Sequence, residues 1–145
     1  MPTPAEAVAD ALGILLQRNF RARLYEVLVE QVHEAVDAAT YPVLSGVARL
    51  QPVTAAALGG AIGLDRSVVS RRANSLAGAG LLEYQADATD RRACLLTLSP
   101  AGEAVIATLR QRLVTVLDDR LRSWPSRDRS QFADLLTAFV AAGPL

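Results

Sequence analysis

Lysine is absent from this sequence of 145 residues, and cysteine, histidine and tryptophan occur only once each. One cysteine cannot form an internal disulfide, which agrees with a reducing compartment. One histidine and one cysteine also provide no plausible Ser/His/Asp or Cys/His arrangement, so we do not expect an enzyme. A metal site at His33 would need more ligands of the right type than its neighbours supply, so we expect a surface histidine and no metal or cofactor.

Long apolar runs are also missing from the sequence. No segment is apolar over enough residues to cross a bilayer, and residues 1–6 lack the basic and apolar regions of a secretory signal. We therefore expect a cytoplasmic protein without a membrane partner.

The charges balance, with 15 basic and 15 acidic residues. A protein of zero net charge does not coat nucleic acid by bulk attraction, so any binding to DNA must come from the placement of particular side chains. Every basic residue is an arginine, which biased genome composition explains more simply than function does. The length fits a single domain over residues 1–145, and a hydrophobic fraction of 51% is ample for a core.

The residues from Thr54 onward have the pattern of two helices joined by a tight turn. Thr54 can accept a hydrogen bond from a first-turn amide, and strong helix formers follow it. Gly63 permits the positive φ that ends a helix, and Asp65 can cap a second helix soon afterwards. So short a turn requires a sharp angle between the helices, which predicts a helix-turn-helix.

The second helix of this pair has two distinct faces. Four polar residues share one face, at the spacing i, i+3, i+4, i+7: Ser67, Ser70, Arg71 and Asn74. Three apolar residues lie on the opposite face: Val69, Ala73 and Leu76. Serine and asparagine can hydrogen-bond phosphates and base edges, and the planar guanidinium matches guanine or phosphate bidentately. On its own, such a face is usually only solvated.

A predicted hairpin changes the interpretation of that face. Residues 87–92 are polar and turn-rich, and they lie between the strand-compatible residues 81–84 and 93–98. The tip carries Arg91 and Arg92, and an inserted guanidinium can read the width of a narrow minor groove. Helix-turn-helix and hairpin together predict a winged unit that contacts DNA.

These motifs resemble the multiple antibiotic resistance regulator (MarR) family. The resemblance is carried by Val53-Thr54 with Leu58, by Leu64 to Arg71, by Gly80-Leu81-Leu82, and by Asp87 to Arg92 running into Leu96 to Gly102. In that family the recognition helix matches residues 65–76, and the Asp-x-Arg of the wing matches Asp90 and Arg92. The resemblance covers the central third closely and the flanking helices more weakly. It implies a homodimeric, DNA-binding transcriptional regulator, often released by a small ligand or by oxidation.

Arg72 departs from the family pattern, because members commonly carry an apolar residue there. Its stem can lie along the core with its head in water, or it can extend the DNA surface. We therefore rank Arg72 below Arg71 as a DNA contact.

Apolar residues recur at helical spacing on both sides of the winged unit, which we place at residues 42–99. They predict one long helix over residues 5–38, and over residues 100–142 a long helix beginning at Pro100 and a last helix capped by Ser126. A shorter helix near residues 43–50 leads into the DNA-binding unit. A lone chain has no obvious cover for the terminal apolar faces, so we expect these terminal helices to form a dimer.

Three further residues have alternative interpretations. No second cysteine can resolve an oxidised Cys94, so strand packing is favoured for it over redox sensing. Tyr25 and Trp124 can line a ligand pocket, although aromatic residues at helical spacing more often belong to the core.

The predicted fold is mainly α with a small β-wing: a winged helix-turn-helix with N- and C-terminal dimerisation helices. We expect a homodimeric transcriptional regulator that binds a palindromic operator in double-stranded DNA, and we favour a repressor over an activator. We expect a small aromatic effector to release it from the operator. The alternatives are a winged-helix module that binds another protein and a ligand-binding protein without DNA activity. The side chains expected at the DNA are Thr54, Arg66, Ser67, Ser70, Arg71, Asn74, Asp90, Arg91 and Arg92.

Overall fold

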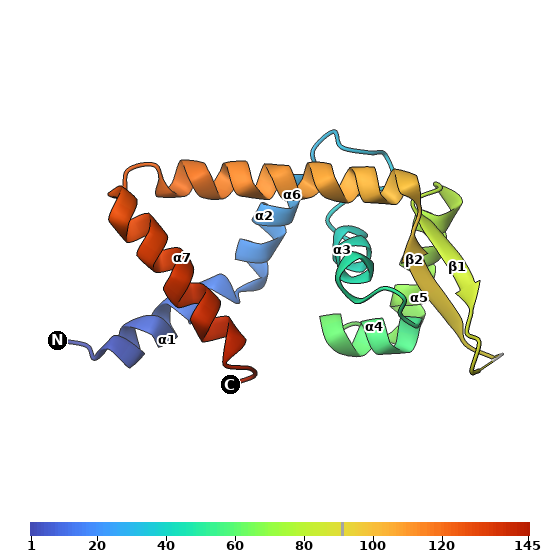
Figure 1. Ribbon diagram of the computed structural model, residues 1–145, viewed down its shortest axis with the longest axis horizontal. Coiled ribbons are helices and arrows are strands. Elements are labelled where there is room, and N and C mark those ends of the chain that lie inside the picture. Colours follow the sequence, from blue (N-terminus) through green and yellow to red (C-terminus); the bar gives the residue numbers. More distant parts are fainter. Residues whose placement is uncertain (91) are drawn as a thin grey trace. The chain divides into compact units, whose positions relative to one another are not determined.

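The computed structural model describes residues 1–90 and 92–145. Within these residues the chain forms helices and one two-stranded sheet (Figure 1). The elements are α1 (Pro4–Leu15), α2 (Arg18–Val29), α3 (Tyr41–Leu50), α4 (Ala55–Ile62), α5 (Arg66–Gly78), β1 (Leu82–Ala86), β2 (Cys94–Leu98), α6 (Pro100–Leu121) and α7 (Ser126–Ala141). The prediction of a mainly helical fold with a small wing is confirmed. No helix among the described residues is both long and apolar enough to cross a membrane.

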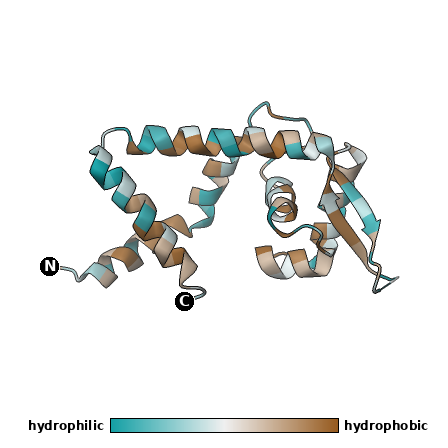
Figure 2. Ribbon diagram, viewed as in Figure 1, coloured by the Kyte–Doolittle hydropathy of each residue, from teal (hydrophilic) through white to brown (hydrophobic). Residues whose placement is uncertain are grey.

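The chain divides into two compact units, Met1–Arg110 and Gln111–Leu145. The core of the first unit comes from α2, α3, α4, α5 and the hairpin, with α3 in contact with α4, α5 and β2. Its fully buried side chains are Leu28, Val43, Leu44, Val47, Leu58, Val69, Leu76, Leu81 and Leu96. Figure 2 shows that β2 is mostly hydrophobic, whereas β1 is largely hydrophilic.

The helix-turn-helix is formed by α4 and α5, and its first helix ends as predicted. The hydroxyl of Thr54 accepts a hydrogen bond from the Ala57 amide at 3.1 Å, and Gly63 ends α4 with a φ of +72°. The turn brings the backbone of Leu64 against Gly59, so that position 59 has no room for a side chain. A Cβ at Gly59 would lie 2.5 Å from the Leu64 carbonyl oxygen.

The predicted side-chain cap at Asp65 is wrong. Asp65 occupies the N-cap position of α5 with extended backbone, but its side chain makes no capping hydrogen bond. The residue is exposed, so water can satisfy the first-turn amides in its place. The predicted packing face of α5 is confirmed, because Val69, Ala73 and Leu76 are all buried.

β1 and β2 form an antiparallel hairpin in which Leu82 pairs with Leu98 and Ala86 with Cys94. At its tip, the carboxylate of Asp87 accepts hydrogen bonds from the amide and the hydroxyl of Thr89, at 2.9 and 2.8 Å. These two bonds hold the pKa of the Asp87 carboxyl below its usual value. The wing is therefore ordered by a charged residue that does not need to contact DNA.

The prediction of one helix over residues 5–38 is wrong. α1 ends at Leu15, Gln17 is extended, and α2 ends at Val29. Spacing of apolar residues does not reveal a break of this kind, because their helical phase is nearly the same on both sides of Gln17.

Residues 31–40 are turns instead of helix. Gln31 has a positive φ of 54°, and the Asp37 carboxylate accepts hydrogen bonds from the amides of Ala39 and Thr40 at 2.9 and 2.8 Å. Local bonds of this type offer the backbone an alternative to the helical pattern. They also lower the pKa of Asp37, with the Thr40 amide making the largest contribution.

α6 begins at Pro100 as predicted, and the Ser99 hydroxyl accepts a hydrogen bond from the Gly102 amide at 3.0 Å. In the second unit, the predicted cap at Ser126 is wrong, because Pro125 occupies the cap position and no side chain caps α7. A capping side chain must belong to the residue before the first helical one, and Ser126 is already helical.

The turn between α4 and α5 gives a prediction with a matched control. Gly59→Ala should lower the free energy of unfolding by about 1–3 kcal/mol, because the added methyl overlaps a backbone oxygen. Gly60 lies in the same helix with nothing within 4 Å of its Cβ position, so Gly60→Ala should raise stability by about 0.5–1 kcal/mol. Urea unfolding measures both. Equal effects of the two substitutions would show that the close approach at Gly59 does not constrain the turn.

Candidate nucleic-acid interface

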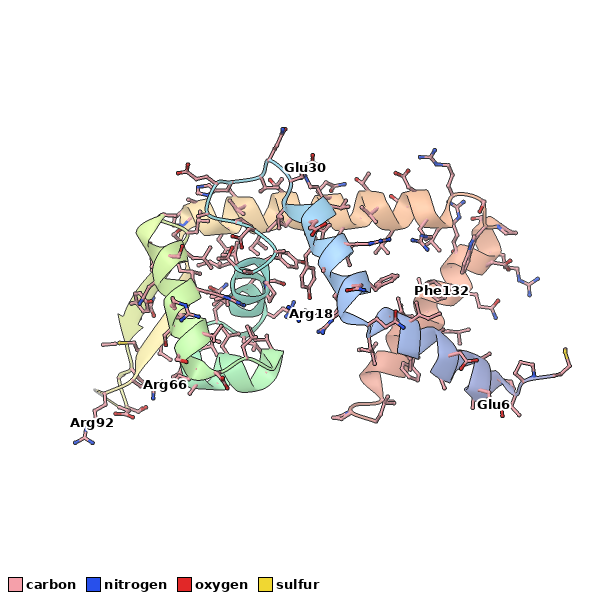
Figure 3. The ribbon with its side chains drawn as sticks, turned by 180° about the vertical axis from the view of Figure 1, so that it is seen from behind. Glu6, Arg18, Glu30, Arg66, Arg92 and Phe132 are labelled. Atoms are coloured by element: carbon pink, nitrogen blue, oxygen red, sulfur yellow. The ribbon has the colours of Figure 1, made fainter. Side chains whose placement is uncertain are left out.

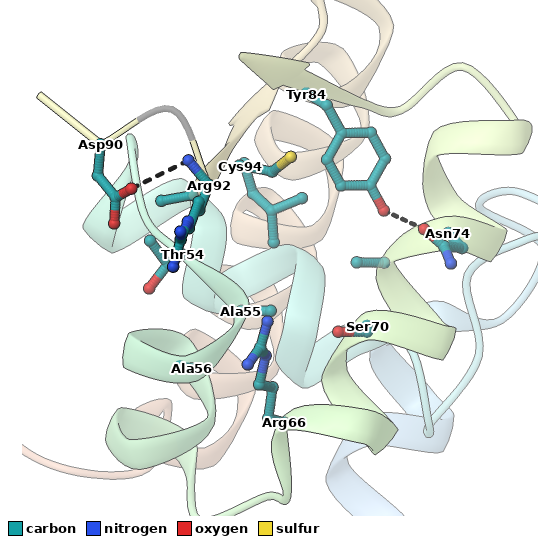
Figure 4. Close-up of a pocket in the computed structure, with 13 residues that line it drawn as sticks. Thr54, Ala55, Ala56, Arg66, Ser70, Asn74, Tyr84, Asp90, Arg92 and Cys94 are labelled. Atoms are coloured by element: carbon teal, nitrogen blue, oxygen red, sulfur yellow. Dashed lines mark hydrogen bonds between the residues drawn. The ribbon is translucent and has the colours of Figure 1, made fainter. Parts of the chain in front are cut away.

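Six of the predicted DNA contacts line one hollow of about 560 Å³ between the start of α4, helix α5 and the wing. They are Thr54, Arg66, Ser70, Asn74, Asp90 and Arg92 (Figure 4). Ser67 and Arg71 are exposed on α5 but do not line this hollow. Arg91 lies outside the described residues. Helix and wing thus bring together polar groups that are up to 38 positions apart in the sequence, from Thr54 to Arg92.

The two guanidinium groups of the hollow are available for an anion. Figure 3 places Arg66 and Arg92 on the same edge of the winged unit. Within residues 1–90 and 92–145, the recorded ion pair joins Arg122 to Asp119 and involves neither of these arginines. Both are exposed, so each can exchange water for a phosphate oxygen without breaking a protein contact.

Asp90 also lines the hollow and offsets part of its positive charge. Its carboxylate accepts a hydrogen bond from the backbone amide of Arg92 at 2.9 Å, which fixes the chain where the arginine leaves the wing. Thr54 has a similar structural part, since its hydroxyl oxygen caps α4. Its own proton remains available for donation to a phosphate.

Tyr84 of β1 also lines the hollow, although the sequence did not predict it there. Its hydroxyl donates a hydrogen bond to Oδ1 of Asn74, across the gap between the wing and α5 (Figure 4). Burial raises the pKa of Tyr84, with a smaller contribution from Cys94, so the hydroxyl stays protonated. Alternation along a strand shows which residues share a face, but it does not show which helical residue they meet.

Cys94 also lines the hollow, and the prediction that it packs inside the strand is wrong because it is exposed. It lies on the same face of β2 as Leu96 and Leu98, which are buried. Cys94 pairs with Ala86 at the end of the hairpin, beyond the reach of the core.

A second hollow, of about 690 Å³, lies within the first unit and is lined by α2, α3, the end of α4 and Arg72 of α5. Arginine is its prominent charged residue: Arg18, Arg21, Arg49 and Arg72 all line it. No carboxylate is among its described lining residues. Tyr25 and Tyr41 also belong to it, with ring centroids 4.8 Å apart.

The structure places Arg72, Tyr25 and Trp124, for which the sequence left alternatives open. Arg72 is half-buried in the second hollow and does not extend the first hollow. Tyr25 lines a hollow, as one alternative proposed, whereas Trp124 packs edge-on against Phe132 at 5.3 Å in the second unit. His33 is half-buried, and its Nδ1 accepts a hydrogen bond from the Ala35 amide at 3.0 Å. The described residues contain no cluster of metal-ligating side chains.

Comparison with known proteins finds a family model that matches part of the chain. Residues 36–93 match the model of the MarR family, and none of the curated proteins matches the sequence. A MarR transcriptional regulator from Methanosarcina mazei Go1 is 17% identical, with 95% of this chain and 96% of that chain covered and a TM-score of 0.74. Wild-type MarR from E. coli in its apo form is 16% identical, with 96% and 98% covered and a TM-score of 0.72.

A third similar structure is the PcaV transcriptional regulator from Streptomyces coelicolor in complex with its natural ligand. It is 23% identical, covers 96% of this chain and 92% of its own, and has a TM-score of 0.58. Residues 36–93 thus resemble the MarR family, and the chain shares the fold of solved MarR transcriptional regulators.

Proposed function

We propose that this regulator is a repressor that binds a palindromic operator as a homodimer. The observation that carries the proposal is the convergence of α5 and the wing on one hollow with two arginines, neither of which has an ion-pair partner recorded within residues 1–90 and 92–145. α5 would enter the major groove, with Ser67, Ser70 and Arg71 at base edges or phosphates. The wing would place Arg92, and Arg91 beside it in sequence, at the minor groove.

The homodimer is supported by apolar side chains that the single chain leaves exposed. α1 and α7 contain no buried residue. Large apolar side chains exposed on α1 and just after it are Val8, Ile14, Leu15 and Leu16, and those on α7 are Phe132, Leu135, Leu136, Phe139 and Val140. An exposed apolar face of this kind on a helix marks an interaction site. A second copy would cover it and bring two recognition helices to half-sites about one helical turn apart.

We also propose that a small aromatic anion regulates DNA binding from the second hollow. Four arginines without an opposing lining carboxylate favour an anion, and the paired Tyr25 and Tyr41 rings favour an aromatic body. The hollow touches both α2 and α5, so a ligand that fits one arrangement of these helices better would shift the population toward it. PcaV, a similar structure, is recorded with its natural ligand bound.

The first prediction concerns the wing. Arg92→Ala should weaken binding to a selected operator about tenfold or more and make the salt dependence shallower by about one unit per protomer, because fewer counterions are released. Arg23→Ala removes the same charge from an exposed position of α2 that lines neither hollow, so it should leave both quantities unchanged. Fluorescence anisotropy over a range of salt concentrations measures them. If Arg92→Ala binds as well as wild type at matched salt, the wing has no part in DNA binding.

The second prediction concerns assembly. Leu136→Asp should convert the dimer to monomer and reduce operator binding, since the charge would have to lose its water in the proposed interface. Ser130→Asp adds the same charge on the opposite side of α7 by helical spacing, and it should remain dimeric. Sedimentation velocity separates the two states. A folded, monomeric wild-type protein that still binds the full operator would contradict the homodimer.

The third prediction concerns the effector. Benzoate should lower the affinity for the operator, whereas its neutral amide, benzamide, should act much more weakly because it lacks the charge that the arginines attract. Arg18→Ala should reduce the response to benzoate, and Arg23→Ala, in the same helix but outside the hollow, should not. If benzoate and related aromatic carboxylates leave the operator complex unchanged at every concentration, the second hollow is not an effector site for this class.

A protein-interaction role remains the rival function, and the neutral net charge is the observation that favours it. Selection from a pool of randomised duplexes distinguishes the two. Enrichment of a palindromic sequence supports operator binding, whereas a pool that stays random at low salt leaves protein recognition as the better explanation.

A further inference from the structure

The hydrogen bond between Tyr84 and Asn74 joins the wing to the recognition helix. Tyr84 lies on β1, where it pairs with Leu96 of β2, and its ring reaches the last turns of α5. There its hydroxyl donates to Oδ1 of Asn74. Both residues line the hollow at the proposed DNA surface, and both are exposed. The bond is therefore at the place where a base edge would be read.

The direction of this hydrogen bond determines which end of the asparagine side chain is occupied. A carboxamide has an oxygen that accepts and an amino group that donates, and rotation by half a turn exchanges them. In the structure the hydroxyl of Tyr84 donates to Oδ1, so the oxygen of Asn74 turns toward the wing. No hydrogen bond to the amino group of Asn74 is recorded within residues 1–90 and 92–145. Figure 4 shows this amide with its oxygen facing Tyr84.

An asparagine held in this way has a restricted choice of bases. Bidentate recognition of adenine needs the oxygen to accept from N6 while the amino group donates to N7. Here the oxygen is turned toward Tyr84 and one of its two lone pairs is engaged, so the amino group is the end left to face a base. In the major groove, the groups that accept from a donor are guanine O6 and N7 and thymine O4, together with adenine N7 alone.

We propose that Tyr84 is a specificity-determining positioning residue, which orients Asn74 as a hydrogen-bond donor so that it selects guanine, the base with two major-groove acceptors, at its position in the operator. The inference rests on the proposed binding of DNA by α5. Tyr84 itself need not touch DNA, because it acts through the orientation of Asn74. This role is specific to the tyrosine hydroxyl, since phenylalanine would keep the ring and its packing.

Selection from a randomised duplex pool, followed by sequencing, tests the proposal on the full-length chain. Asn74→Ala identifies the position that residue 74 reads, as the one where base preference is lost. At that position the wild type should prefer guanine over adenine and cytosine. Tyr84→Phe should reduce this preference roughly three- to tenfold, the effect of one hydrogen bond, while preferences at other positions stay as in wild type.

Asn74→Asp provides an independent variant. Its carboxylate can still accept from Tyr84, but it presents an acceptor where asparagine presents a donor, so preference should move toward cytosine N4 or adenine N6. The matched control is Gln85→Ala. Gln85 follows Tyr84 on β1, so its side chain lies on the opposite face of the strand, and the variant should reproduce the wild-type preferences. Thermal unfolding confirms that each variant is folded at the selection temperature.

Each remaining outcome is decisive. Wild-type preferences retained in Tyr84→Phe, or a uniform loss of affinity at all positions, would overturn the positioning role while leaving operator binding intact. A preference in Asn74→Ala that matches wild type at every position would show that residue 74 reads no base. If the wild type itself enriches no sequence, operator binding fails first, and the inference fails with it.

Discussion

The burial of Val69, Ala73 and Leu76 is the constraint on which the rest of the recognition surface depends. These three side chains are within 1% of complete burial, in a core that also contains residues of α3 and β2. Because a helix has a fixed period, burying this face turns Ser67, Ser70, Arg71 and Asn74 to the other side. The same core holds Leu96, and through β2 it fixes the wing beside α5. The proposed DNA surface is thus a consequence of packing among buried side chains.

Placement compensates for the absence of net charge. The chain has equal numbers of acidic and basic residues, yet the hollow between α5 and the wing contains Arg66 and Arg92 against a single carboxylate, Asp90. That carboxylate is directed to the backbone amide of Arg92. The second hollow has arginines and no lining carboxylate among the described residues. Two concentrations of positive charge therefore coexist with overall neutrality, one proposed for operator DNA and one for an effector.

The winged unit could be predicted because its signals are local. Thr54 and Gly63 mark the ends of α4 by their own side-chain and backbone chemistry, and the period of Val69, Ala73 and Leu76 identifies the buried face of α5. The break between α1 and α2 at Gln17 could not be predicted, because the helical spacing of the apolar residues hardly changes across it.

Features that depend on contacts between elements were also missed. The bond from Tyr84 to Asn74 requires knowing how the wing lies against α5, and the exposure of Cys94 depends on where the core ends beneath the hairpin. The arginines of the second hollow come from three helices whose sequence positions give no sign that they meet. Arg91 remains a prediction from the sequence.

Groove-specific footprinting tests operator recognition by α5 and the wing most directly. Dimethyl sulfate methylates guanine N7 in the major groove and adenine N3 in the minor groove, so one reagent reports on both. With the full-length protein on a duplex selected from random DNA, we expect guanine N7 to be protected in two half-sites about one helical turn apart. Adenine N3 should be protected beside them, where the wings would lie. Protection confined to the minor groove, or none in either groove on a duplex that the protein binds, would contradict this mode of recognition.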